Sequence, residues 1–261
     1  MVNKKIAHGS KTDYYQGLSL ISNLYTPQNL SDTGIIYGDR PFTSYLLFGL
    51  NGISNNAADH YRLTSDLWVG VLGKSALGKQ VQSFGHLIPP NNPPKGWDKQ
   101  LSNSLAIQYR LRVDYLAFKF ARLIEGVATA EANVGMIDIK GSAGYFMRLG
   151  ILNPYLSSVG PNNSRNRRYK RVSLVQLYLR FGQEYIINAF DATLEGGLIK
   201  QQKNQYVLAP NEVKRQLWNY HASLGITVGG FDLEFRGDFL TKQFKGGTDF
   251  KWGTIKGSFA F

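Results

Sequence analysis

The chain has no cysteine among its 261 residues, which excludes a disulfide framework and thiolate chemistry. It also has no apolar run near the roughly 20 residues that a membrane-spanning helix needs. Acidic residues are few, 18 against 30 lysines and arginines, so the formal net charge is +12. Such a charge favours an anionic partner, either nucleic acid or lipid phosphate. Because no recognisable nucleic-acid-binding module accompanies the charge, we predict no nucleic-acid partner.

What the chain does contain is alternation of apolar and polar residues. Tyr, Phe and Gly are abundant, which suits strands better than helices. Side chains on a strand point alternately to its two faces, so this pattern predicts strands with one apolar and one polar face. Many of the segments approach the 9–11 residues or so that a tilted strand needs to cross a bilayer. The segments are 14–25, 45–51, 61–72, 105–115, 127–136, 143–151, 175–181, 218–228, 231–239 and 252–261.

A soluble sandwich of two sheets can alternate in the same way, with its polar residues facing water. Here, however, aromatic residues lie on the apolar faces throughout the chain, which favours a lipid-facing band with aromatic girdles. We therefore predict an all-β fold, a single antiparallel transmembrane β-barrel domain over residues 1–261. Its outward band should contain Tyr109, Trp218, Phe231 and Phe235.

Two details refine this prediction. The last segment ends the chain on the aromatic Phe261, which is typical of bacterial outer-membrane barrels. An eleventh segment, 190–198, could be strand or loop. Its Gly196-Gly197 pair and the polar stretch 200–205 favour a loop. We therefore expect about ten strands in a bacterial outer-membrane protein.

One segment breaks the alternation. In residues 75–87, Leu77, Val81 and Phe84 recur near helical spacing, and a proline-rich stretch follows. The pattern predicts a short helix inserted between two strands. Insertions at the rim of a barrel often carry function, although a surface cap is the simpler interpretation.

Several short stretches occur in a characteristic order along the chain. They are Tyr25-Thr26-Pro27, Gly38-Asp39-Arg40-Pro41-Phe42, Leu72-Gly73, Gln82-Ser83-Phe84-Gly85-His86 and Gly96-Trp97-Asp98-Lys99-Gln100-Leu101. In order and spacing they resemble the lipid A 3′-O-deacylase family of outer-membrane barrels, the LpxR type. The resemblance covers nearly the whole chain. It implies a twelve-stranded barrel, lipid A of lipopolysaccharide as the substrate, hydrolysis of an ester-linked acyl chain, and calcium as a cofactor.

The resemblance also assigns roles to residues. His86 would be the catalytic general base that draws a proton from water, and an imidazole with a pKa of about 6.5 suits that role. Gln82 lies one helical turn earlier, on the same face, and would orient His86 or a substrate group. Asp39 and Arg40 would bind substrate. Without the flanking stretches, His86 would be read as a capping or solvent-facing residue. Trp97 is expected to pack the helix against the wall.

The chain departs from the family pattern in three places. The acidic residue that follows the family histidine by six positions is Asn92 here, and the loop 28–37 lacks a family lysine. The family's first strand carries an Asn-Asp pair that helps to hold calcium, and its second a Tyr-Thr-x-Gly element. Only seven residues separate Gly17 from Tyr25, too few to finish one strand and complete another. We therefore interpret 14–25 as the third family strand and leave the metal ligands unassigned.

This interpretation predicts a gap or a strained closure between segment 14–25 and the last strand. The opening MVNKKIAHGSKTD also lacks the apolar core of a secretory signal peptide. We expect the gene upstream of Met1 to encode a signal peptide and two strands. In the chain as it stands, little or no deacylase activity is expected, and a soluble protein without a signal is the competing interpretation.

Two classes of function stay open. The first is a lipid A deacylase of the outer membrane. The alternative is a non-catalytic outer-membrane barrel, either a pore or an inactive relic of the family. The basic loop 162–171, NNSRNRRYKR, could clamp lipopolysaccharide phosphates under the first interpretation, or simply form a hydrated turn.

Overall fold

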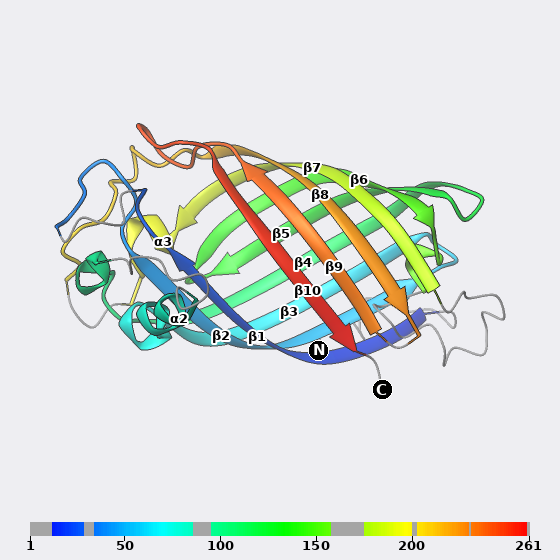
Figure 1. Cartoon of the computed structure of the whole chain (residues 1–261), viewed down its shortest axis with the longest axis horizontal. Coiled ribbons are helices and arrows are strands. Elements are labelled where there is room, and N and C mark those ends of the chain that lie inside the picture. Colours follow the sequence, from blue (N-terminus) through cyan, green and yellow to red (C-terminus); the bar gives the residue numbers. More distant parts are fainter. Residues whose placement is uncertain are drawn as a thin grey trace.

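The computed structural model describes residues 12–28, 34–85, 95–157, 175–199, 203–229 and 231–259. Ten antiparallel strands follow one another around a single curled sheet, each paired with its neighbour in the chain (Figure 1). This confirms the predicted all-β class and the count of ten. The strands are β1 Thr12–Tyr25, β2 Thr43–Asn56, β3 Tyr61–Leu72, β4 Ser104–Phe120, β5 Ile124–Gly135, β6 Asp138–Ile151, β7 Val175–Asp191, β8 Gln216–Val228, β9 Phe231–Leu240 and β10 Phe250–Phe259.

Eight of the ten strands are longer than the alternation alone indicated. β4 and β7 each have 17 residues, because both continue past the clearly alternating part of the sequence. The doubtful segment 190–198 does not form an eleventh strand. Phe190 and Asp191 end β7, and the short helix α3 (Ala192–Glu195) follows, with the Asp191 side chain accepting a hydrogen bond from the Thr193 backbone N–H. The preference for a loop is confirmed.

The sheet forms a half-barrel rather than a closed ring. β1 pairs with β2 and β10 with β9, and in the described part of the chain no ladder joins β1 to β10. The predicted gap is therefore present. At one end the two edges still share contacts, because the guanidinium of Arg40 lies 4.2 Å from the ring centre of Tyr25 and 5.7 Å from that of Phe250.

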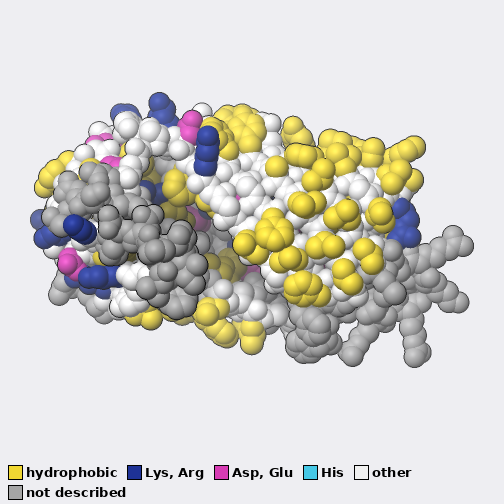
Figure 2. Space-filling view, viewed as in Figure 1, with side chains coloured by type: hydrophobic (Ala, Val, Ile, Leu, Met, Phe, Trp, Pro, Cys, Tyr) yellow, Lys and Arg dark blue, Asp and Glu magenta, His cyan; other side chains and the backbone are white. Residues whose placement is uncertain are grey.

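The two faces of the sheet differ as predicted. Trp218, Phe231 and Phe235 are exposed on the outer face, and the half-buried Tyr109 belongs to the same face of its strand. Figure 2 shows hydrophobic side chains spread over this wall. An apolar surface of this extent suits a strand wall that faces lipid. Polar residues of β8 such as Asn219 and His221 lie on the buried inner face.

Four of the five described helical elements gather at one end of the sheet (Figure 1). They are η1 Lys74–Ala76, α2 Gly78–Gly85, η2 Gly96–Lys99 and α3. At the other end, the turns at 57–60 and 121–123 are short, and the connection after β6 carries the single turn η3 (Tyr155–Ser157). Bacterial barrels place short turns in the periplasm and longer loops outside, so we take the helical end as external. No described helix has the length and apolarity to cross a membrane.

The inner side of the curl is packed rather than empty. Near the external end, Leu47, Trp68 and Leu72 belong to one buried apolar cluster. Near the opposite end, Phe146 and the Tyr155 ring of η3 (Tyr155–Ser157) belong to a second cluster. Apolar side chains therefore pack inside the curl towards both ends.

Candidate functional site

The insertion predicted at 75–87 consists of two short helices. η1 and α2 are separated at Leu77, whose φ of 60° lies in the left-handed region. This residue turns the chain so that Gly78, at the start of α2, lies directly on Ser44 of β2. A Cβ atom at Gly78 would come within 2.5 Å of the Ser44 side chain. The predicted helix is confirmed, with a break that the spacing did not reveal.

Gln82 is held in place by Trp97 of η2. The Trp97 Nε1–H donates a hydrogen bond of 2.6 Å to Oε1 of Gln82. Trp97 is 1% exposed and its ring centre lies 5.3 Å from that of Phe42, so it packs as predicted. Asp98 forms an exposed ion pair with Lys79, as suits a turn residue. The predicted base, His86, lies outside the described residues, as do Asn92 and the loop 162–171.

Asp39 and Arg40 occupy the loop between β1 and β2. The Asp39 carboxylate accepts hydrogen bonds from the backbone N–H groups of Gln28 (2.9 Å) and Arg40 (2.7 Å). Its backbone carbonyl accepts a bond from the Tyr206 hydroxyl, at 3.0 Å. Asp39 therefore stabilises the loop that carries Arg40, and its contact with substrate stays a prediction.

The Arg40 guanidinium is almost fully buried, with 4% of the residue exposed. Its two Nη atoms donate to Gln243 Oε1 and to Thr193 Oγ1, both at 3.2 Å. Burial lowers the pKa of this guanidinium from its usual value, while Tyr25 and nearby carboxylates counter the effect. Arg40 is thus a buried cation held in place by these hydrogen bonds. Direct binding of substrate by Arg40 stays a prediction too.

A cavity of about 530 Å³ lies inside the curl. Tyr25 and Tyr45 line one side, and Asp138 and Lys140 of β6 line another, with an ion pair of 2.9 Å between them. Trp252 reaches it from β10. The sequence analysis named Tyr25 only within the stretch Tyr25-Thr26-Pro27 and missed the other residues. Their only signal was a place on the polar face of each strand, which many other residues share.

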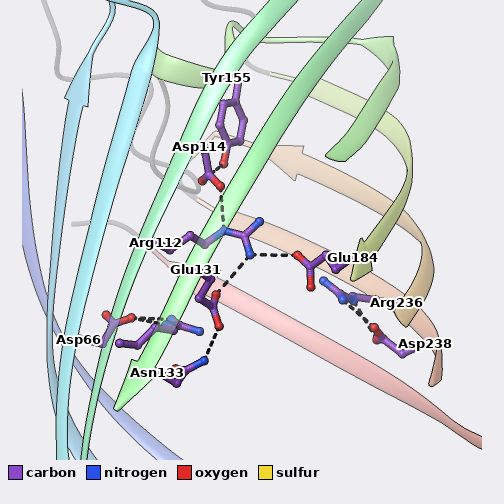
Figure 3. A network of polar contacts seen from close by, with 10 residues as sticks. Asp66, Arg112, Asp114, Glu131, Asn133, Tyr155, Glu184, Arg236 and Asp238 are labelled. Carbon is purple, nitrogen blue, oxygen red and sulfur yellow. Dashed lines mark hydrogen bonds and ion pairs between the residues drawn. The ribbon is translucent and has the colours of Figure 1, made fainter. Parts of the chain in front are cut away.

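Next to the cavity, Arg112 of β4 is the centre of a polar network (Figure 3). Its Nε donates to Asp114 at 2.7 Å, and its Nη1 contacts Glu131 at 3.3 Å and Glu184 at 3.1 Å. The Tyr155 hydroxyl also donates to Asp114, at 2.7 Å. Because Glu184 belongs to β7, the network reaches across the inside of the curl. It therefore occupies part of the space that a pore would need.

The described residues offer no ready metal site. Among them, no group of three or more histidine or carboxylate side chains converges closely enough to hold an ion. Several inner carboxylates are instead paired with arginine, as the network in Figure 3 shows, and Asp138 is paired with Lys140. Calcium therefore has no ligand set that can be named in this part of the chain.

Comparison with known proteins agrees with this architecture. A family model described as "Outer membrane protein LpxR" matches residues 1–261, the whole chain. The chain belongs to the LpxR family. It is a bacterial outer-membrane protein, as the strand wall also indicates. Among curated protein sequences, none matches it.

A solved structure supports the LpxR fold. The match is to "LpxR from Salmonella typhimurium", at 20% sequence identity and a TM-score of 0.77. It covers 96% of this chain and 88% of that chain. At this identity the likeness shows the fold alone. The family membership and the fold together give the protein the architecture of an outer-membrane lipid A deacylase.

Proposed function

We propose that the protein is a hydrolase that removes an ester-linked acyl chain from lipid A. The observation that carries the proposal is the family match over all 261 residues. The helical insertion adds support, because α2 and η2 lie at the end of the sheet that we take as external. Lipid A in the outer leaflet would meet the protein at that end.

In the proposed reaction, His86 accepts a proton from a water molecule as the water oxygen attacks the ester carbonyl. The bond between the acyl carbon and the sugar oxygen then breaks, and His86 returns the proton to the departing sugar alkoxide. The products are a free fatty acid and a lipid A hydroxyl group. A neutral imidazole is suited to both transfers near neutral pH. Gln82 would orient His86 or the ester, and Asp39 and Arg40 would bind the polar part of lipid A.

Calcium enters the proposal through the family resemblance alone. The described residues do not fit the ion, since no three histidine or carboxylate side chains among them converge to hold it, so we assign it no step. Whether the protein needs calcium is a separate experimental question. If it does, chelation with EDTA should abolish acyl release and added calcium should restore it. Unchanged release after exhaustive chelation would remove calcium from the proposal.

The alternative of a pore finds less support. Side chains of the Arg112 network cross the inside of the curl, and buried apolar clusters lie towards both ends. A water-filled channel would instead need an inner wall with hydrated, separated charges. This packing says nothing against an inactive member of the family, which only an activity assay excludes.

The test is mass spectrometry of lipid A from cells that express the protein from its natural gene, which is called the parent protein here. The parent protein should release one acyl chain, and His86→Ala should lower the rate about 10²–10⁴-fold. The matched control is His60→Asn. His60 lies in the β2–β3 turn at the opposite end with a φ of 61°, which asparagine tolerates. His60→Asn should deacylate like the parent. If His86→Ala does so too, His86 is not the base.

A further inference from the structure

Trp97 connects the helical insertion to the strand wall. Its indole Nε1–H donates to Oε1 of Gln82 at 2.6 Å, in the middle of α2. An indole nitrogen can only donate, so the bond fixes which end of the Gln82 amide faces Trp97. The oxygen points to the indole, and the NH₂ group is left to donate to another acceptor.

The indole itself has little freedom to move. A Cβ atom at Gly78 would lie 2.7 Å from Cη2 of Trp97, so the backbone of α2 touches the ring on one side. On the other side the ring packs against Phe42, and a Cβ atom at Gly96 would lie 2.3 Å from Cε2 of Phe42. The backbone N–H of Leu101 also donates to the carbonyl of Phe42 at 2.9 Å. Two glycines thus permit a close packing that holds the N–H in one direction.

The same hydrogen bond holds the two helices of the insertion, α2 and η2, close together. Gln82 and Trp97 are 15 positions apart, and the bond ties the helix α2 to the helix η2. Closing a segment of this length costs conformational entropy, which a buried and well-directed contact offsets. Here the indole of Trp97 is buried, and the distance from its nitrogen to the Gln82 oxygen is short.

We propose that Trp97 is a positioning residue of the deacylase site, and that it acts by orienting the amide of Gln82. The inference rests on the proposed function, because it needs a reaction in which Gln82 takes part. It predicts a role for one N–H group of Trp97, beyond the packing of its ring.

The test is Trp97→Phe, which keeps an aromatic ring against Phe42 and removes the N–H group. The rate of acyl release should fall about tenfold, as the loss of one well-directed hydrogen bond implies. The matched control is Trp68→Phe. Trp68 is also buried, and its Nε1–H donates to Ser19 at 2.9 Å on the inner wall. This variant should deacylate at the parent rate.

A double-variant experiment separates positioning from packing. If Trp97 acts through Gln82, Trp97→Phe should add no further loss to Gln82→Ala. A purely structural role would instead multiply the two losses. Multiplied losses, or a Trp97→Phe rate equal to that of Trp68→Phe, would overturn the inference while leaving the proposed function intact. A parent protein that releases no acyl chain would overturn the proposed function, and the role of Trp97 with it.

Discussion

The Arg112 network offers a quantitative test of how the inside of the half-barrel is stabilised. Arg112 contacts three carboxylates, on β4, β5 and β7. Their side chains are only 4% (Asp114), 15% (Glu131) and 16% (Glu184) exposed. Replacing Arg112 with Met keeps much of the aliphatic volume but leaves these charges without their shared cation. The loss of one partner from a buried ion pair costs about 3–5 kcal/mol.

We expect Arg112→Met to lose about 3 kcal/mol of the free energy of unfolding, the lower end of that range. Two of the carboxylates keep other donors, because Tyr155 donates to Asp114 and Asn133 donates to Glu131. Adding Glu184→Gln should restore part of the loss, since that glutamate has no such second donor among the bonds recorded for the described residues.

The assay is urea unfolding in detergent micelles, followed by tryptophan fluorescence. Lys79→Met is the control. Lys79 pairs with Asp98, and the two side chains are 53% and 80% exposed. Losing this exposed ion pair should cost about 1 kcal/mol or less. The reasoning is refuted if Arg112→Met loses no more than this control, or if Glu184→Gln deepens the loss.

Three further predictions use the same unfolding assay. Tyr155→Phe should lose about 1.5–3 kcal/mol, because it removes a hydrogen bond to the charged Asp114, and an unchanged midpoint would contradict this. Gly78→Ala should lose about 1–3 kcal/mol through overpacking against Ser44, whereas a neutral result would mean that α2 can shift away. Arg40→Met should lose about 2 kcal/mol or more with the buried ring contact, and a stability equal to the parent would show that the two sheet edges do not depend on it.

The strand wall could be predicted from sequence because each strand shows its two faces locally. In β8, exposed Trp218 and Tyr220 alternate with buried Asn219 and His221, and lipid on one side is enough to impose that order. Helical spacing likewise revealed α2. The break at Leu77 was missed, since its left-handed conformation goes with a contact between Gly78 and Ser44, far along the chain, that helical spacing does not reveal.

The inner network could not be predicted by the same reasoning. Arg112 and Glu184 are 72 positions apart, and their contact depends on the curvature of the sheet. From the polar face of a strand, one can predict only that a side chain points inward. It does not say which charges meet there. The link between Tyr206 and Asp39 spans 167 positions and has no sequence signal either.

Arg40 shows that a family resemblance can identify a site residue without showing how that residue acts. Within the family pattern, Asp39 and Arg40 would bind substrate directly. In the structure both Nη atoms already donate, to Gln243 and Thr193, and the guanidinium is covered by Tyr25. A direct clamp would therefore require those bonds to exchange for bonds to substrate. Without such an exchange, Arg40 would act as a buried positive charge that fixes Tyr25 at the wall of the cavity.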